Sequence, residues 1–496
     1  MPSLRVLFIA AEADPFIKIG GLGDVAGSLP RALRTITSQS ADSTEFASID
    51  VRLVIPYYGV IRQQDYSLQH VATFNVASSD GPIQAEAFMT KVNDLPVYLL
   101  SGLPIKADAP VYTADASVDG IKFTFFSLAA LELARALNWP PHIVHANDWH
   151  TSLAIYSLGI SRKRDKFYYN TSALLGLHNL PYLGDGAETA LEEFNLPPAS
   201  SSSLPMWAQS MPLPLGLLAA DHIVAVSPTY AKEILTPEFG SGLQDFLLTR
   251  SDTISGILNG LDTHQWDPAT DPALVSNFSP QHLEDRKANK VALQKELNLP
   301  VDQNIPIFGM VSRMENQKGF DLIPGALRQI SNMSWQAVIL GTGDPKLETA
   351  VQRLQEDYPE RVRAIIRYDN VLSRRIYAGS DVLLIPSRYE PCGLTQMIAM
   401  RYGCVPIARA TGGLKDTIHD FHQSAESTGF LFAKASSASL AAAMRRALLT
   451  FPNQEAWIGL QRRGMAQDFT WERFARQYFE LYRSLVNERN QVVSLE

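Results

Sequence analysis

Short apolar runs alternate with helix-like stretches along most of this 496-residue chain. In the second half, the apolar runs have the length and β-branched content of buried strands. They cover residues 305–311, 336–340, 362–366, 382–385 and 405–408. The helical patterns that separate them cover 321–330, 346–355, 372–378 and 396–402. This alternation predicts an α/β protein with parallel, doubly wound sheets, whose ligands bind at the carboxyl ends of the strands.

The first half repeats the pattern, and the chain is too long for a single core. Its expected strands are residues 6–10, 51–55, 97–100, 143–146, 173–177 and 222–226. We therefore predict two Rossmann-like domains, 1–257 and 258–470, that face each other across a deep cleft. Residues 39–46 are expected to form a loop. The tail, 471–496, carries apolar side chains at helical spacing, which indicates a helix packed on a domain surface.

The overall composition limits the classes of partner and the cellular location that we expect for this protein. A formal charge of −8 argues against a nucleic-acid partner, which favours a basic face. No apolar run approaches the length that spans a membrane, and the N-terminus lacks the pattern of a signal peptide. The chain has only two cysteines, Cys392 and Cys404, so a disulfide framework is excluded and a cytoplasmic location is expected.

The segment from Ser387 to Thr395, Ser-Arg-Tyr-Glu-Pro-Cys-Gly-Leu-Thr, is the most informative stretch for chemistry. It joins an expected strand to an expected helix, so Glu390 lies in a strand-to-helix turn just before the amides of Gly393, Leu394 and Thr395. Free amides at a helix start bind phosphate, and glycine lets a ligand approach the backbone closely. This arrangement favours an enzyme that holds a sugar nucleotide by both ends.

A second glycine-rich loop, Lys18-Ile-Gly-Gly-Leu-Gly-Asp24, follows the first expected strand. Its spacing resembles a dinucleotide fingerprint, but the glycines begin well after that strand ends. A nicotinamide site is therefore disfavoured. A glycine turn that packs helix on sheet is one alternative, and a lysine-bearing loop that approaches a diphosphate is the interpretation we prefer.

Two cations, Arg313 and Lys318, follow the first expected strand of the second half. Fixed cations at this position can stabilise a departing diphosphate without a metal. A pair of solvated surface charges is the alternative.

The stretch Asn147-Asp-Trp-His-Thr151 follows another expected strand, so His150 could hydrogen-bond a sugar, while Asn147 or Asp148 caps the next helix. A zinc site is disfavoured because His142 and His145, three apart in a strand, face opposite sides. The sequence contains neither an Asp-x-Asp motif nor a Gly-Lys-Ser/Thr loop. Metal-chelated diphosphate and P-loop chemistry therefore lose support.

Taken together, these segments resemble the bacterial glycogen synthase and plant starch synthase family of retaining glycosyltransferases, glycosyltransferase family 5. The matching motifs run in family order across nearly the whole chain. They are Lys18 to Asp24, Asn147 to Thr151, His178-Asn179, Val226 to Tyr230, Gly256 to Asp262, Val311 to Gly319, Gly341 to Asp344, Ser387 to Gln396 and Thr411 to Gly413. The resemblance implies a GT-B fold with an acceptor-side first domain, a nucleotide-sugar-binding second domain, and a C-terminal helix that returns to the first.

The resemblance also implies ADP-glucose as donor, an α-1,4-glucan as acceptor, and no cofactor or metal. From the family pattern, the residues expected to act in catalysis are His150, Arg313, Lys318 and Glu390. The donor-binding residues are expected to be Lys18, Gly21, Asp24, His150, Asn259, Arg313, Lys318, Tyr368, Glu390, Cys392, Gly393, Leu394 and Thr395. Within this set, Tyr368 is expected against the adenine, and Glu390 near the anomeric carbon of the glucose.

The sequence departs from the family pattern mainly on the expected acceptor side. A family Asn and Lys are replaced by Met211 and Pro214, a Gln by Leu183, and the Gly before Tyr368 by Arg367. Two alternatives therefore stay open besides glucan extension from ADP-glucose. One is the same fold with UDP-glucose or another acceptor, and the other is a weakly catalytic glucan-binding homologue.

Overall fold

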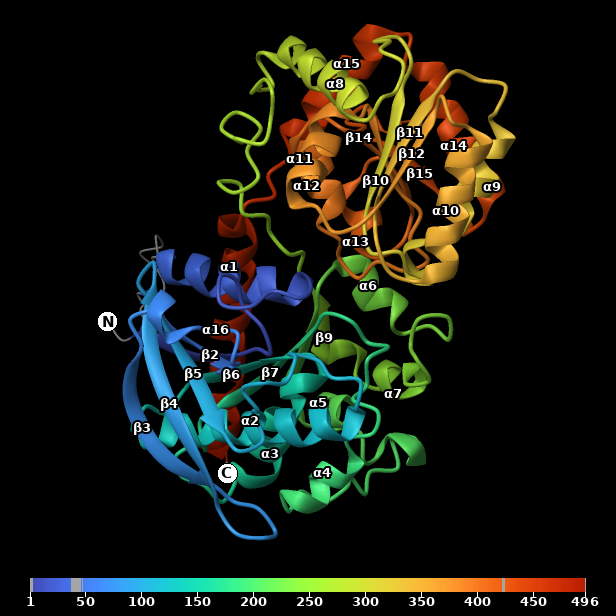
Figure 1. Cartoon of the computed structure of the whole chain (residues 1–496). Coiled ribbons are helices and arrows are strands. Elements are labelled where there is room, and N and C mark those ends of the chain that lie inside the picture. Colours follow the sequence, from blue (N-terminus) through green and yellow to red (C-terminus); the bar gives the residue numbers. More distant parts are fainter. Residues whose placement is uncertain (1–2, 37–45, 47, 422–423, 496) are drawn as a thin grey trace. The chain divides into compact units, whose positions relative to one another are not determined.

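The computed structural model describes residues 3–36, 46, 48–421 and 424–495, and the chain divides into two compact units (Figure 1). The first unit comprises Met1–Gly260 and Trp471–Glu496, and the second comprises Leu261–Thr470. The division falls after Gly260, three residues beyond the boundary predicted from the sequence. The loop predicted at 39–46 lies, apart from Phe46, outside the described residues. Each unit is described by itself below.

The first unit is built on a nine-stranded sheet of order β3-β4-β5-β2-β1-β6-β7-β8-β9. All neighbouring strands are parallel except β3–β4 and β4–β5, which are antiparallel. The strands are β1 (Ser3–Ile9), β2 (Ser48–Pro56), β3 (Gln69–Val76), β4 (Ile83–Val92), β5 (Leu95–Gly102), β6 (Ile143–Asn147), β7 (Ser172–Leu177), β8 (His222–Ala225) and β9 (Ile254–Gly256).

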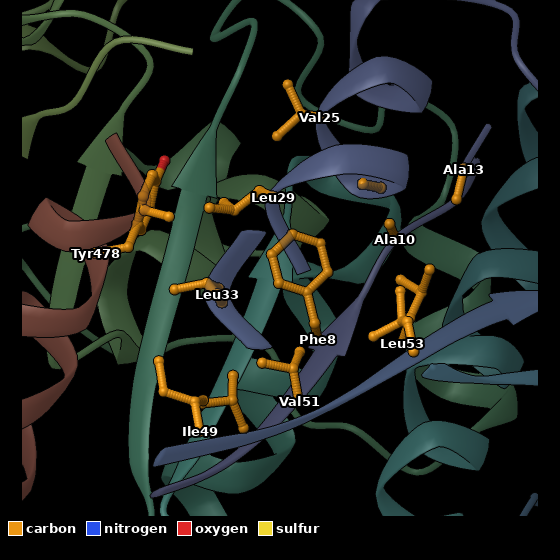
Figure 2. Packing of buried hydrophobic residues seen from close by; sticks show 14 of the residues in the cluster. Phe8, Ala10, Ala13, Val25, Leu29, Leu33, Ile49, Val51, Leu53 and Tyr478 are labelled. Carbon is orange, nitrogen blue, oxygen red and sulfur yellow. The ribbon is translucent and has the colours of Figure 1, made fainter. Parts of the chain in front are cut away.

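Helices bury both faces of this sheet. They are α1 (Gly21–Thr35), α2 (Ala116–Ala136), α3 (Trp149–Ser161), α4 (Glu188–Glu193), α5 (Pro212–Ala219), α6 (Pro228–Glu233), α7 (Gln244–Leu248) and α16 (Trp471–Leu495). Figure 2 shows Leu29 and Leu33 of α1 between Phe8 of β1 and Tyr478 of α16. On the opposite face of β1, Leu7 and Ile9 are buried as well. The apolar stripe of the tail thus completes the core of the first unit.

The second unit contains a six-stranded, wholly parallel sheet of order β12-β11-β10-β13-β14-β15. The strands are β10 (Ile307–Val311), β11 (Gln336–Gly341), β12 (Val362–Ile366), β13 (Val382–Ile385), β14 (Val405–Arg409) and β15 (Phe430–Phe432). Counted from β10, this is the 3-2-1-4-5-6 order of a dinucleotide-binding fold. The predicted doubly wound architecture is confirmed in both units.

Eight helices are described in the second unit. They are α8 (Arg286–Glu296), α9 (Leu322–Gln329), α10 (Pro345–Asp357), α11 (Asn370–Gly379), α12 (Thr395–Arg401), α13 (Gly412–Thr417), α14 (Ser437–Thr450) and α15 (Gln454–Met465). Short 3₁₀ turns in the two units cover Gln63–Asp65, Met206–Ala208, Ser251–Thr253, Leu283–Asp285 and Asn316–Lys318. Within the described ranges, no helix combines the length and apolar character needed to cross a membrane.

The sequence pattern located the central strands to within a few residues and missed four others. β3 and β4 form an antiparallel extension in which exposed and half-buried side chains mix along the strands, so their apolar signal is weak. β9 and β15 have only three residues each, which is too short for a periodic signal.

Candidate substrate-binding site

In the second unit, the residues predicted to bind phosphate and sugar lie mainly in the loops that follow two neighbouring strands, β10 and β13. The chain order of the sheet reverses between these strands, because β11 and β12 lie on one side and β14 and β15 on the other. Ligands of open parallel sheets bind at such a switch point, at the carboxyl ends of the strands. Lys318 comes from the loop after β10 and Glu390 from the loop after β13. The fold thus brings together two residues that are far apart in the sequence.

Lys318 and Glu390 form an ion pair. Nζ of Lys318 lies 2.8 Å from both Oε1 and Oε2 of Glu390, and the hydroxyl of Ser387 donates to Oε2 at 2.8 Å. Glu390 is only 7% exposed. A buried carboxylate requires such donors, and removal of one partner leaves an uncompensated charge. The carboxylate is therefore held in one orientation before any substrate arrives.

The backbone of the Glu390 loop is fixed from several sides. The buried guanidinium of Arg409 donates to the carbonyl oxygens of Ser387, at 3.0 Å, and of Arg388. The amide of Gly413 donates to the Glu390 carbonyl at 3.1 Å. A β-carbon on Gly412, whose φ is +44°, would lie 1.9 Å from that carbonyl oxygen. The glycine pair that opens α13 therefore lets the Glu390 loop pack closely against it.

The amides expected to hold phosphate lie at the start of α12. Gly393 has a φ of +74°, and a β-carbon there would come within 2.5 Å of Oε1 of Gln396. The side-chain amide of Gln396 donates to the carbonyls of Cys392 and Gly393, at 3.0 and 2.9 Å, and so holds the turn. Within the described part of the chain, the amides of Gly393, Leu394 and Thr395 donate to no backbone carbonyl. They are available to an anion.

The two remaining candidates in the second unit are exposed. Arg313 follows β10 and pairs with Glu315 at 2.8 Å, and its side chain is 63% exposed. Such surface pairs are weak, so an incoming phosphate can replace the carboxylate. Tyr368 is 84% exposed, and Arg367 beside it is paired with Asp369 at 2.9 Å. The phenol ring of Tyr368 is therefore open for stacking.

The first unit has its own switch point, between β1 and β6. Glu12 lies just beyond β1 and is buried, and its carboxylate accepts hydrogen bonds from the amides of Ile19 and, at 3.0 Å, Gly20. Burial raises the pKa of Glu12 despite these bonds. The carboxylate fixes the loop that precedes α1. This role of Glu12 was not predicted from the sequence, although an acidic residue shortly after a buried strand was a signal for it.

The loop fixed by Glu12 presents Lys18, Gly21 and Asp24. Lys18 donates to Asp24 at 2.6 Å, and both side chains are partly exposed. A β-carbon on Gly21 would meet no atom within 4 Å, whereas one on Gly23 would lie 3.1 Å from the Glu12 carboxylate. A side chain at Gly23 would therefore crowd Glu12 and Lys18, whereas Gly21 has open space around it.

His150 lies beyond β6 among aromatic rings. The ring centroids of Trp149, Phe123 and Tyr112 are 4.4, 4.8 and 5.0 Å from that of His150. Burial lowers the pKa of His150 to about 3, and the charge of Lys122 adds to the effect. The imidazole is consequently neutral at physiological pH. Its Nδ1 is buried with no hydrogen-bond partner among the described residues, so the ring has an unused polar atom.

The structure corrects the expected cap of the following helix. Asp148 occupies the N-cap position of α3, but its side chain makes no capping hydrogen bond. Its Oδ1 instead accepts from the amides of His178 and Asn179, at 2.7 and 3.2 Å. Oδ1 of Asn147 accepts from Nε2 of His178 at 2.9 Å, and the side-chain amide of Asn147 donates to the carbonyl of Ile9 at 2.9 Å. Both residues therefore tie the ends of β6 and β7 together instead of capping the helix.

Three of the positions that depart from the family pattern, Leu183, Met211 and Pro214, belong to one packed region beside Trp149. The amide of Leu213 donates to the carbonyl of Leu183 at 3.1 Å. A β-carbon on Gly184 would lie 2.9 Å from both Pro212 and Trp149. Met211 and Pro214 are buried. Apolar contacts thus occupy the region where a lysine was expected.

Asn259 is buried near residue 260, where the N-terminal part of the first unit ends, and its Oδ1 has no hydrogen-bond partner within the described residues.

The buried ion pair between Lys122 and Asp119, at 2.7 Å, was, like the role of Glu12, not predicted from the sequence. Lys122 also donates to the carbonyl of Val111. The described parts of the chain contain no group of three or more His, Cys, Asp or Glu side chains arranged to hold a metal ion.

Two doubly wound units with charged loops at their switch points define a glycosyltransferase of the GT-B class, and comparison with known proteins agrees. The starch synthase catalytic domain family matches residues 5–249, and the glycosyl transferases group 1 family matches residues 293–459. The chain is 40% identical to a glycogen synthase of Anaeromyxobacter dehalogenans over 488 residues, which cover 97% of this chain and 100% of that protein. It is 37% identical to a Clostridium perfringens glycogen synthase, with 97% and 98% covered. The chain therefore belongs to the bacterial glycogen synthase and plant starch synthase family.

Solved structures give the same result. The catalytic domain of starch synthase IV from Arabidopsis thaliana, bound to ADP and acarbose, matches with a TM-score of 0.85 and 31% identity, covering 98% of this chain and 100% of that one. A sucrose-phosphate synthase from Thermosynechococcus elongatus matches with a TM-score of 0.60 and 20% identity, covering 98% of this chain and 100% of that one. The second similarity concerns the fold alone.

Proposed function

We propose that this glycosyltransferase moves glucose from ADP-glucose to the non-reducing end of an α-1,4-glucan, with retention of configuration. The observation that carries the proposal is the fixed Lys318–Glu390 pair at the switch point of the second unit. Membership of the family supports it, as does the similar Arabidopsis structure that holds ADP together with acarbose.

The diphosphate of the donor would be bound by groups of the second unit. Lys318 has three N–H donors, and Glu390 accepts two of them, which leaves one for a phosphate oxygen. Arg313 can exchange Glu315 for phosphate, and the amides from Gly393 to Thr395 add neutral donors. Tyr368 would stack on the adenine, and Cys392 contributes through the turn that its carbonyl stabilises.

The first unit carries its own set of proposed donor-binding residues. Lys18 and Asp24 lie on the loop that Glu12 fixes, and Gly21 offers backbone that a diphosphate can approach. His150 and Asn259 each have a buried polar atom that has no hydrogen-bond partner among the described residues, which suits hydrogen bonds to sugar hydroxyls.

A front-side route accounts for retention without a second carboxylate. The bond from the anomeric carbon to the phosphate oxygen breaks, and the acceptor's 4-hydroxyl oxygen bonds to that carbon from the same face. The proton of the hydroxyl passes to the leaving phosphate. Glu390 stabilises the positive charge that develops on the sugar, and Lys318 with Arg313 stabilises the departing diphosphate.

These cations and amides supply the charge that a metal would otherwise provide, so we propose that transfer needs neither metal nor cofactor. The formal charge of −8 argues against a nucleic-acid partner. We also propose that the protein works in the cytoplasm and has no membrane partner. Its two cysteines are buried and form no disulfide among the described residues, which fits a reducing compartment.

The test is to incubate the purified protein with glycogen and either radiolabelled ADP-glucose or radiolabelled UDP-glucose, and to count label in the washed polymer. The proposal requires incorporation from ADP-glucose, and loss of that label after digestion with an enzyme specific for α-1,4 bonds. Incorporation mainly from UDP-glucose would establish the alternative donor. Glycogen binding without incorporation from either donor would establish the non-catalytic alternative.

A further inference from the structure

The second unit contains a pocket that none of the proposed donor-binding residues lines. Its volume is about 650 Å³, and it lies between α13, β15 and α14. Ala410, which follows β14, and Ala433, which follows β15, contribute to its wall. The pocket thus opens at the carboxyl ends of two parallel strands, the edge of the sheet at which such folds bind ligands.

Small side chains create the space. Ala433, Ser439, Ala442 and Ala443 line the pocket where larger residues would fill it. Its apolar surface includes Phe432, which belongs to the core of this unit. A cavity of this size with an apolar wall accommodates a small organic molecule, and is much larger than a single inorganic ion requires.

The charged groups at the pocket differ in how they are paired. Arg446 donates to both carboxylate oxygens of Asp420, at 3.1 and 3.2 Å, and to the carbonyl of Leu431 at 2.6 Å. The negative charge of Asp420 is therefore neutralised, and the guanidinium is fixed. The ammonium of Lys415 and the imidazole of His419 also line the pocket and have no hydrogen-bond or ion-pair partner among the described residues. The balance of charge at the pocket is positive.

We propose that this pocket binds a small organic anion whose phosphate or carboxylate group pairs with Lys415, while its body lies against the apolar wall beside Phe432. The guanidinium of Arg446, held by Asp420 and by the carbonyl of Leu431, lines the same pocket as part of a neutral ion pair. Lys415 is exposed and therefore accessible to an anion, and a hydrogen bond between two charged groups is stronger than one between neutral groups. The sequence already contained this lysine, in the run from Thr411 to Asp416, but the proposed transfer reaction gives it no role.

The test uses calorimetric titration with phenyl phosphate, benzoate and benzyl alcohol, which share a ring and differ in charge. Every protein is the full chain carrying Arg313→Ala and Lys318→Ala, so that the proposed donor phosphate site does not contribute. Lys415→Ala removes the cation, and Ala442→Trp fills the pocket. The matched controls are Lys434→Ala, an exposed lysine outside the pocket, and Leu449→Trp, an exposed position further along α14.

We expect one of the two anions to bind saturably, which also identifies the preferred charged group, while benzyl alcohol binds at least tenfold more weakly. Lys415→Ala should weaken that binding about tenfold, the usual effect of losing a charge-assisted contact. Ala442→Trp should weaken it at least as much, because the indole takes the space of the ligand. Both controls should keep the parent affinity. The proposal is overturned if neither anion binds saturably, or if the anion binds equally well after Lys415→Ala and Ala442→Trp. Because the donor site is disabled throughout, neither result depends on the proposed transfer activity.

Discussion

The phenol of Tyr482 lies 2.8 Å from Nδ1 of His145, and this hydrogen bond joins the last helix of the chain to the central strand β6. Both side chains are buried, and Phe8 and Tyr478 pack against the imidazole, with ring centroids 4.6 and 5.8 Å away. Burial lowers the pKa of His145 to about 3 from the usual 6.5. His145 is thus a neutral residue of the core, and we assign it no catalytic role.

This environment predicts loss of stability in mild acid. Between pH 6.5 and about 3 the unfolded chain binds a proton at His145 that the folded chain does not, so stability falls as pH decreases through this window. From pH 7 to pH 5 the loss should be about 1–2 kcal/mol for this one residue. His145→Asn should show a smaller decrease in urea midpoint over that range than the parent protein. The exposed-histidine variant His282→Asn should follow the parent, and identical pH slopes for all three proteins would contradict the assignment.

Gly21→Ala separates substrate binding from folding. Because a β-carbon at this position meets no protein atom within 4 Å, the thermal midpoint should stay at or above that of the parent. If a diphosphate approaches the backbone here, the added methyl group should raise the KM for donor roughly tenfold, as loss of one charge-assisted contact does. Steady-state kinetics and a thermal melt of the same sample check both statements. An unchanged KM would remove Gly21 from the site.

Tyr368 should determine the choice of base. Its ring is 84% exposed, so Tyr368→Ala removes no core packing. Loss of stacking should raise the KM for ADP-glucose about two- to tenfold. The ratio of kcat/KM for ADP-glucose to that for UDP-glucose should therefore fall in the variant. Val371→Ala, at a half-exposed position nearby, is the control and should keep the parent ratio. Equal ratios in all three proteins would show that the base is recognised elsewhere.

Transfer should proceed at its full rate in excess EDTA. Lys318, Arg313 and the amides at the start of α12 supply positive charge to the leaving diphosphate, so no divalent cation is required. The assay compares initial rates with EDTA, with Mg²⁺ and with Mn²⁺. A rate that disappears in EDTA and returns with either metal would contradict this part of the account.

The sequence predicted the parts of the fold that depend on local pattern. β13 appears at the predicted residues because it is a continuous apolar run, buried in the parallel sheet. β12 also appears at the predicted residues, although it is an edge strand that contains Arg363, because its other residues are apolar and three of them are β-branched. Glu390 was correctly placed in a strand-to-helix turn, because the sequence clearly indicates a strand before it, β13, and a helix after it, α12. The extension formed by β3 and β4 was missed because exposed residues interrupt its strands.

Long-range pairing was not predictable from the local pattern. Lys318 and Glu390 are 72 positions apart, and only the strand order, which puts β10 beside β13, brings them within 2.8 Å. The role of Glu12 was not predicted because its carboxylate binds the backbone amides of Ile19 and Gly20, and only the folded loop brings these amides to it. Asp148 was assigned to a helix cap that its position permits, but the amides of His178 and Asn179 compete for its carboxylate.

We propose that Lys318 and Glu390 act in glucosyl transfer and do not merely form a structural ion pair. The direct measurement is the rate of transfer from ADP-glucose to glycogen for Lys318→Ala and Glu390→Ala, with glycogen affinity measured by pull-down on the same samples. Arg328→Ala, which breaks an exposed pair with Asp357, is the matched control. We expect each of the first two variants to lose a factor of about 100–1,000 in rate, the usual cost of removing one transition-state charge contact, while glycogen affinity stays near that of the parent. Near-normal rates in Lys318→Ala and Glu390→Ala would contradict the account.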